Sequence, residues 1–469
     1  MNRRQFLTRS LLTTAAMSSG AIPGLSQIAH ASAFAPVTAR TLVNIKLDGG
    51  PDFRHLLAPA FNSNTSSFGY QSWSAMASAH ALAPSASAWE QRWNQDYTPY
   101  VAGNQQFGIL NNCGWLKSMW EQGKVAVVAN VYGSPSRDHA LASLVMDQGD
   151  RSSGPADSQR SGWGGRLAQN LGTNVMAVTR TPRAFCYAPD PADPQKRVTD
   201  GMIAAQDVRE LKLFSHDPTD MPHQAQPVIS RALSSYYAAK RAEIPSNSIY
   251  KRFFDMEQQL RELGAPIEDR LQSLPVPPAI DALAGDTNPL LDSPYFATQI
   301  RNLYDTIALN DIFDARIASL EYLGFDTHED QKTEIEVRFQ DLFGTGMGLH
   351  ALWISLPADA RANTVFMLSG EFGRQIRANG DAGSDHGEGT CTLIIGEQVN
   401  GGVYGELFPE AELARLNDNS PQIEGKTAID HVFGRVCDWM QPGTGDVVFP
   451  GRASAPMEAG VDLGGLLTT

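Results

Sequence analysis

The chain has 469 residues, of which 42% are hydrophobic and 19% charged, and its formal net charge is −14. These values fit one large globular domain or two ordinary ones, and they exclude a disordered polymer, a coiled coil and a small disulfide scaffold. The acidic balance argues against a nucleic-acid-binding protein. Beyond residue 40 no stretch offers about 20 uninterrupted apolar residues, so we expect no integral membrane segment in the mature chain.

The N-terminal segment has the features of an export signal. The pair Arg3-Arg4 followed by Phe6-Leu7 is typical of a twin-arginine signal, and a weakly apolar run follows it. Ala29-His30-Ala31 provides a cleavage site of the A-x-A type. We therefore predict a signal peptide over residues 1–31, export by the twin-arginine machinery, and a periplasmic or exported mature protein.

Four apolar runs predict short buried strands: Thr41–Leu47, Val125–Val131, Asn363–Leu368 and Thr392–Ile395. They alternate with segments of helical pattern, namely Gly114–Gln122, Arg160–Leu171, Arg301–Tyr322, Thr333–Leu356 and Thr427–Met440. Strands without a polar face, separated by helices, indicate an α/β fold in which a central, mostly parallel sheet carries helices on both faces.

The domain organisation follows from the same pass along the chain. Residues 40–200 form the first part of the α/β domain, and residues 301–445 form the second part. Between them, residues 201–300 are polar, contain prolines and favour helices, so we expect a helical insertion or cap. Residues 446–469 are expected to be a C-terminal tail. The four cysteines lack C-x-x-C spacing, which excludes a zinc knuckle but leaves both disulfides and buried thiols open.

Polar side chains follow the predicted strands at the ends where α/β sheets bind ligands. Asp48 follows the first strand, and Glu371 follows the strand that begins near Asn363. The second strand is followed by four candidate catalytic residues, Ser136, Arg137, Asp138 and His139. The sequence therefore predicts a polar site above one edge of the sheet.

Acid–histidine pairs in loop-like sequence give the candidate metal ligands. They are Asp326 with His328, Asp385 with His386, and His431 next to Asp430. Such oxygen-rich, histidine-containing sets suit a divalent Zn, Mn, Mg or Ca ion. Structural roles would also explain single members, because Asp326 would serve as a helix cap and Glu371 as the partner of Arg374. The sequence predicts no site role for the remaining histidines, which are His30, His55, His80, His216, His223 and His350.

Several motifs together resemble a known family. They are Leu47–Asp52 (LDGGPD), Ser161–Arg166 (SGWGGR), Gly324–His328 (GFDTH), Ser369–Arg374 (SGEFGR) and Gly383–Gly387 (GSDHG). Over about residues 40–440 the chain resembles the exported bacterial family called domain of unknown function 1501. The resemblance implies an alkaline phosphatase-like or sulfatase-like architecture and a metal-dependent hydrolase of phosphate or sulfate esters.

The resemblance also implies roles for individual residues. The metal ligands would be Asp48, Asp326, His328, Glu371, Asp385, His386 and His431. Two ions would clamp a small anionic ester, Ser136 or a metal-bound hydroxide would attack it, and Arg137 would hold it by a bidentate fork. Asp138 stands where the family commonly has a serine. The alternative expectation is therefore a catalytically degenerate exported protein that binds a partner or a surface glycan.

Overall fold

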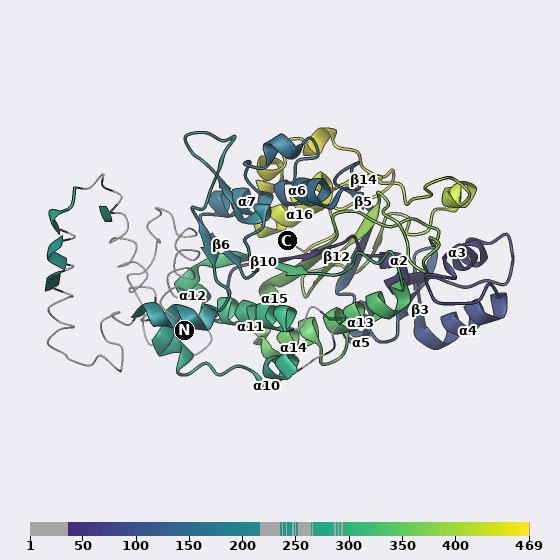
Figure 1. The fold of residues 1–469 in the computed structure, drawn as a ribbon, viewed down its shortest axis with the longest axis horizontal. Coiled ribbons are helices and arrows are strands. Elements are labelled where there is room, and N and C mark those ends of the chain that lie inside the picture. Colours follow the sequence, from purple (N-terminus) through teal and green to yellow (C-terminus); the bar gives the residue numbers. More distant parts are fainter. Residues whose placement is uncertain are drawn as a thin grey trace.

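The computed structural model describes residues 36–215 and 294–468, together with parts of 235–291 (Figure 1). The predicted signal peptide over residues 1–31 and much of the predicted insertion lie outside the described residues. The alternation of strands and helices gives an α/β fold, as predicted.

The main sheet has the strand order β13-β5-β12-β11-β1-β10-β6-β9, and β14 pairs with β5 beside this path. The strands are β1 (Thr41–Leu47), β5 (Val125–Tyr132), β6 (Asn174–Ala177), β9 (Met202–Ala204), β10 (Ala315–Tyr322), β11 (Thr364–Ser369), β12 (Thr390–Gly396), β13 (Gly402–Tyr404) and β14 (Thr427–Ala428). Only β12 runs antiparallel to its neighbours, β11 and β5, so a mostly parallel sheet is confirmed for the described chain.

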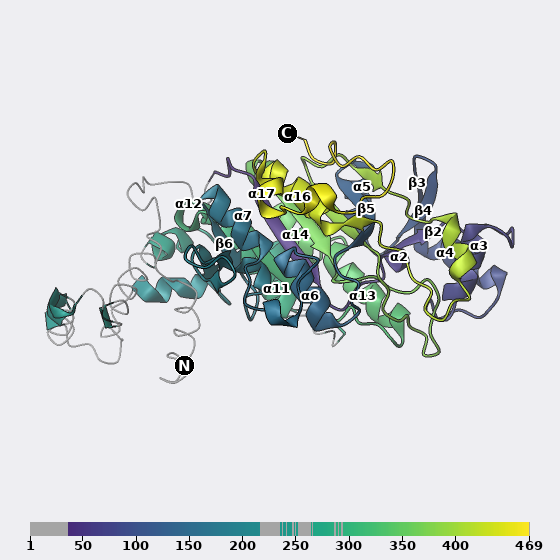
Figure 2. The ribbon, with the colours of Figure 1, turned by 90° about the horizontal axis from the view of Figure 1, so that it is seen from above.

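Two hydrophobic cores, one on each face, hold this sheet between helices. On β1 the side chains of Val43, Ile45 and Leu47 join one core, while Leu42 joins the other, as the two-residue period of a strand requires. One face carries α5 (Gly114–Glu121), α11 (Tyr295–Ala308), α13 (Gln331–Phe343) and α14 (Gly348–Ser355). The other face, seen from above in Figure 2, carries α6 (His139–Gln148), α7 (Trp163–Leu171), α16 (Ile429–Met440) and α17 (Thr444–Val448).

A smaller subdomain at one end of the molecule was not predicted (Figures 1 and 2). Its antiparallel sheet has the order β2-β4-β3, with bounds Leu57–Pro59, Gln105–Leu110 and Tyr97–Ala102, and it packs with α2 (Phe53–Leu56), α3 (Phe68–Met76) and α4 (Ala86–Asp96). The other short elements are β7 (Ala188–Pro189), β8 (Arg197–Val198), α10 (Pro278–Asp281), α12 (Asn310–Phe313) and α15 (Ala358–Asn363).

The predicted helix Arg301–Tyr322 is wrong in its second half. The helix ends at Ala308, and Ala315–Tyr322 forms strand β10, which pairs with both β1 and β6. A short helix, α12 (Asn310–Phe313), follows and ends at Asp314, whose left-handed conformation with φ of 45° stops helical continuation. Pairing with a strand on each side then makes residues 315–322 a strand, and the local sequence pattern carries no information about these distant partners.

The predicted helix Thr333–Leu356 is two helices, α13 and α14. They are separated at Gly344–Gly346, where Gly346 has φ of 84°. The predicted insertion also begins inside the main sheet, because β9 pairs parallel with β6. The predicted C-terminal tail packs against the domain: Leu463 and Leu466 are buried, and Leu467 bridges to Val399.

All four cysteines are free and buried. Their thiols therefore serve as small apolar side chains of the core. Among the helices of the described residues, none has the length and the apolar run that a membrane crossing needs.

Candidate metal centre

The turns after β1 and β10 are joined by backbone hydrogen bonds at the carboxyl edge of the sheet. Asp48 donates its N–H to the carbonyl of Tyr322 at 2.8 Å, and Phe325 donates to the carbonyl of Asp48 at 2.9 Å. Gly49 has φ of 113°, and a Cβ there would collide with the backbone of Asp326. Glycine is therefore required for the close approach that places the two turns side by side.

The antiparallel direction of β12 brings a long loop back to this same edge. The chain leaves β11 after Ser369 and enters β12 at Thr390, so residues 370–389 begin and end above the carboxyl ends of the parallel strands. Asp385 and His386 lie in this loop. They meet the turn after β10 although that turn is about 60 positions earlier in the chain.

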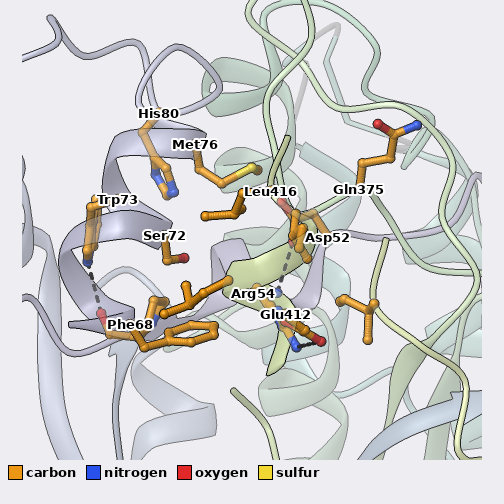
Figure 3. Close-up of a pocket in the computed structure, with 14 residues that line it drawn as sticks. Asp52, Arg54, Phe68, Ser72, Trp73, Met76, His80, Gln375, Glu412 and Leu416 are labelled. Atoms are coloured by element: carbon orange, nitrogen blue, oxygen red, sulfur yellow. Dashed lines mark hydrogen bonds and ion pairs between the residues drawn. The ribbon is translucent and has the colours of Figure 1, made fainter. Parts of the chain in front are cut away.

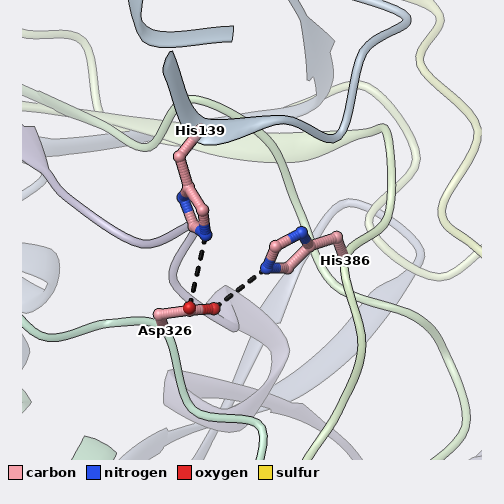
Figure 4. Close-up of side chains that lie close together, drawn as sticks. All are labelled: His139, Asp326 and His386. Carbon is pink, nitrogen blue, oxygen red and sulfur yellow. Dashed lines mark hydrogen bonds and ion pairs between the residues drawn. The ribbon is translucent and has the colours of Figure 1, made fainter. Parts of the chain in front are cut away.

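Three imidazoles converge on the carboxylate of Asp326. The Nε2 atom of His386 lies 2.9 Å from Asp326 Oδ1, and that of His328 lies 3.1 Å from the same oxygen. The Nε2 atom of His139, the first residue of α6, lies 3.3 Å from Oδ2. Figure 4 shows His139 and His386 facing the two carboxylate oxygens of Asp326. One ligand atom from each of His139, Asp326 and His386 lies within 4.8 Å of the other two.

The other nitrogen of each ring faces an oxygen acceptor. The pairs are His139 with Glu371 Oε1 at 2.9 Å, His328 with Asp385 Oδ1 at 3.1 Å, and His386 with the carbonyl oxygen of Arg137 at 2.9 Å. A carbonyl or an ionised carboxylate only accepts, so each Nδ1 carries the hydrogen of its ring. In the neutral rings, three Nε2 lone pairs then point at a carboxylate that also only accepts. Because all of these groups are acceptors, a cation or a proton is needed between the Nε2 atoms and the carboxylate of Asp326.

The electrostatics keep the central carboxylate ionised. Burial opposes the charge of Asp326, but a proton held between this carboxylate and His386, together with the hydrogen bond and charge of Arg374, lowers its pKa to about 2. Burial lowers the pKa of His386, which favours the neutral ring. The hydrogen bond to Glu371 raises the pKa of His139, so a proton competes most strongly for that ring.

Arg374 holds together the turn after β1, the turn after β10 and its own loop, residues 370–389. Its guanidinium is fully buried and donates to Asp326 Oδ1 at 2.8 Å and to the carbonyls of Phe325 at 2.9 Å and Ser384 at 2.8 Å. It also donates to the turn after β1, at the carbonyl of Gly50. The expected Glu371–Arg374 pair is therefore wrong, because Arg374 pairs with Asp326 instead.

The capping role considered for Asp326 is also wrong. Helix α13 begins at Gln331, and Asp330 is its N-cap residue. Asp326 precedes this N-cap residue in the loop after β10, where its carboxylate faces the imidazoles.

Glu371 connects the histidines to the turn after β1. Its Oε1 accepts from His139 and from the backbone N–H of Gly49 at 2.9 Å. Its Oε2 is buried and has no hydrogen-bond partner among the described atoms. Burial alone would raise its pKa, but the hydrogen bond from His139 and the charge of Lys46 hold the pKa below its ordinary value.

Asp48 meets a lysine that the sequence analysis missed. The ammonium of Lys46 donates to Asp48 Oδ1 and, at 2.6 Å, to the hydroxyl of Ser143 on α6. The signal for Lys46 was present, because Asn44 and Lys46 interrupt an apolar strand two residues apart and therefore lie on one face.

The structure places the other expected catalytic side chains away from the carboxylate of Asp326. Asp138 is the N-cap of α6, where its Oδ1 accepts from Leu141 N at 2.9 Å. The hydroxyl of Ser136 accepts from Asp138 N at 3.1 Å. The guanidinium of Arg137 donates to the side chains of Ser420 and Gln422, each at 2.6 Å.

His431 does not join the other expected ligands. It lies on α16, and its Nε2 hydrogen bonds with the carbonyl of Ala455 at 2.9 Å. Within the described part of the chain it forms no hydrogen bond or ion pair with the three clustered histidines. The neighbouring Asp430 pairs with Arg151.

The described structure also contains a separate cavity of about 30 Å³ (Figure 3). It is lined by His80, Trp73, Asp52, Gln375 and Leu416 among others, and by none of the clustered histidines. A cavity of that size has room for water but not for a substrate. We therefore place the candidate site at Asp326 and not at this cavity.

The comparison with protein families agrees with the resemblance noted in the motifs. The family model described as "Protein of unknown function (DUF1501)" matches residues 117–418, which is more than half of the chain. The chain belongs to this family. The match contains His139, Asp326, His328, Glu371 and His386, whereas Asp48 and His431 fall outside it. Neither the curated proteins nor the solved structures give a significant match.

Proposed function

We propose that the protein is an exported metal-dependent hydrolase of phosphate or sulfate esters. The observation that carries the proposal is the convergence of three imidazole Nε2 atoms on the ionised carboxylate of Asp326. Each imidazole is fixed from behind by an oxygen acceptor, the arrangement found around metal-bound histidines. The position beyond the carboxyl ends of parallel strands is where α/β proteins bind ligands.

The donor set fits a transition-metal ion better than a hard cation. Three nitrogens and one carboxylate suit Zn²⁺ or Mn²⁺, whereas Mg²⁺ and Ca²⁺ prefer all-oxygen ligands. His139, Asp326 and His386 would hold the ion, and His328 offers a further Nε2 atom beside them. The side chain of Asp326 is 44% exposed, which would leave a bound ion open to solvent and substrate.

A bound divalent ion supplies Lewis acidity toward an ester oxygen and toward a water molecule. Residues around the centre orient the side chains that would hold this ion. Arg374 holds Asp326, and Glu371 fixes the ring of His139 so that its Nε2 faces the centre. Because the hydroxyl of Ser136 is engaged in its own turn, water is the better candidate for the attacking group.

Metal analysis of the purified protein tests this function directly. The protein is loaded with Zn²⁺, Mn²⁺ or Ca²⁺, dialysed, and assayed with a panel of phosphate and sulfate esters. We expect bound Zn²⁺ or Mn²⁺ and ester hydrolysis that chelation abolishes. A protein that retains no metal and stays inert after all three loadings would contradict the proposal.

A second candidate is a degenerate hydrolase that binds a small anionic ester or a surface glycan without turnover. Asp138 favours it, because that residue caps α6 in place of the serine common in the family. Metal binding without hydrolysis in the wild type would support this candidate. Hydrolysis gained by Asp138→Ser would indicate that a nucleophile is what the site lacks.

Export by the twin-arginine machinery is part of the proposal. Its support is the Arg3-Arg4-Gln5-Phe6-Leu7 segment and the following cleavage motif. Expression of the full chain in a bacterium with this machinery, followed by N-terminal sequencing of the periplasmic protein, tests it. We expect a new N-terminus near residue 32 and loss of export in the Arg3→Lys, Arg4→Lys variant.

A further inference from the structure

Lys46 places a fixed positive charge next to the proposed metal centre. It lies on β1, on the face that packs toward α6, because its side chain alternates with those of Ile45 and Leu47 in the opposite core. Only 11% of its side chain is exposed. The ammonium therefore forms part of the structure and is not a solvated surface charge.

Two oxygen atoms accept hydrogen bonds from this ammonium, one from Asp48 and one from Ser143, and its charge lowers the pKa of Glu371. Lys46, Asn44 and Glu371 also line a common cavity of about 10 Å³, together with Arg183, Ser369 and the apolar side chains of Met146, Trp163 and Phe433. The Glu371 Oε2 and Asn44 Oδ1 atoms are buried without hydrogen-bond partners among the described atoms.

Carboxylate, hydroxyl and amide oxygens are the donors that hard cations bind in proteins. The position of the Lys46 ammonium is thus one that a metal ion would otherwise suit. Asp48, which the sequence analysis assigned to a metal, instead pairs with this ammonium. At Asp326 the internal cation is Arg374, which donates to Oδ1 at 2.8 Å and leaves Oδ2 facing the Nε2 atom of His139 at 3.3 Å.

We propose that the Lys46 ammonium takes the place of a second metal ion, so that each chain binds one divalent ion, at His139, Asp326 and His386. This inference rests on the proposed metal centre. The charge of the ammonium repels a second divalent ion and neutralises part of the charge of Asp48 and Glu371. The two-ion clamp expected from the resemblance is therefore replaced by one ion and one fixed ammonium.

The number of ions per chain is the first test. The full chain is stripped with chelator, loaded with excess Zn²⁺ or Mn²⁺, dialysed, and analysed for metal per mole of protein. We expect one ion. Two ions in the wild type would overturn this inference and leave the proposed function standing. No bound ion would overturn both.

Variants of Lys46 give the second test by the same metal analysis. Lys46→Met removes the charge and opens the oxygen-lined position, so the capacity should rise from one ion to two. Lys46→Arg keeps the charge and should stay at one. Lys124→Met is the matched control, because Lys124 pairs with Glu397 at 2.7 Å and lies outside the site. A Lys46→Met protein that folds and still binds one ion would overturn the role of the ammonium. If that variant fails to fold, Lys46→Gln, which keeps a polar side chain and removes the charge, takes its place, and a single bound ion in Lys46→Gln would overturn the role of the ammonium.

Discussion

The Nε2 atom of His386 lies 2.9 Å from Oδ1 of Asp326, although the two residues are 60 positions apart in the chain. The opposite nitrogen of the same ring faces the carbonyl of Arg137, so the ring is oriented from both sides. A neutral imidazole in this orientation presents a lone pair to a carboxylate. The proposed metal ion would convert that unfavourable contact into two bonds.

Replacement of His386 should therefore separate metal binding from folding. We expect His386→Ala to weaken Zn²⁺ binding by about 100-fold or more, because a donor is lost from the centre. His431→Ala is the matched control, since His431 bonds to the carbonyl of Ala455 instead. Titration calorimetry on both variants checks this. Equal affinities in the two variants would show that the site is elsewhere.

The turn at Gly49 should be essential for the same centre. Gly49→Ala combines a disfavoured φ of 113° with a collision against the backbone of Asp326, so we expect a loss of about 1–3 kcal/mol in the free energy of unfolding and weaker metal binding. Gly172 also has a positive φ, 64°, but within the described part of the chain no atom lies within 4 Å of the position that a Cβ would take there. Gly172→Ala should therefore cost some stability and leave the metal affinity unchanged. Urea denaturation and metal titration on both variants separate the two effects. Similar metal affinities in both would contradict the role given to Gly49.

A buried polar network under the site should contribute strongly to stability. The side chain of Gln331 donates to Asp52 Oδ2 at 2.9 Å and accepts from Ser384 Oγ at 2.5 Å. Gln331→Leu would leave both partners unsatisfied, so we expect the free energy of unfolding to fall by about 3 kcal/mol. Gln169→Leu on the exposed side of α7 should change it by less than about 0.5 kcal/mol. Matching urea midpoints for the two variants would refute this prediction.

Acid should destabilise the metal-free protein through its buried histidines. Burial lowers the pKa of His55 and of His80 well below the ordinary value, so both rings are neutral in the folded chain and take up protons on unfolding. The unfolded state binds more protons, and stability therefore falls as the pH drops below about 6.5, by about 1.4 kcal/mol per pH unit for each ring. The raised pKa of His139 acts in the opposite direction and offsets part of this loss.

Urea denaturation in chelator between pH 7 and pH 5 checks this dependence. In His80→Gln one of the two rings is absent, so the loss of stability with acid should be shallower than in the wild type by up to about 1.4 kcal/mol per pH unit. Stability curves of equal slope would show that His80 is already protonated in the folded protein.

Four strands of the main sheet, β1, β5, β11 and β12, and the edge of the site were predicted from the sequence because they depend on local patterns. The apolar pattern of Thr41–Leu47 is clear enough that the predicted strand has the observed bounds, and Asp48 follows it directly. Strand β10 was missed because Arg316 and Glu321 interrupt its apolar pattern, and its burial comes from neighbours far along the chain.

Which polar side chains meet could not be predicted in the same way. His139 was expected to act in catalysis, yet the structure groups it with Asp326, 187 positions later, because the first residue of α6 contacts the turn after β10. His431 has the same Asp–His sequence context as His386 but lies on a helix that faces another part of the molecule. The spacing of residues in the sequence does not show which distant side chains come into contact, because tertiary packing decides those contacts.

The reversed direction of β12 has a consequence for how this family can diversify. Because residues 370–389 leave the sheet and return to it at one edge, insertions between Arg374 and Ser384 need not disturb any crossover helix or strand register. The middle of the loop is anchored as well, because Asn379 donates to the carbonyl of His328 at 2.7 Å and Ala382 forms a bridge with Glu329. The exposed turn at Gly380 and Asp381 is therefore the place where relatives can lengthen the loop while the scaffold stays constant.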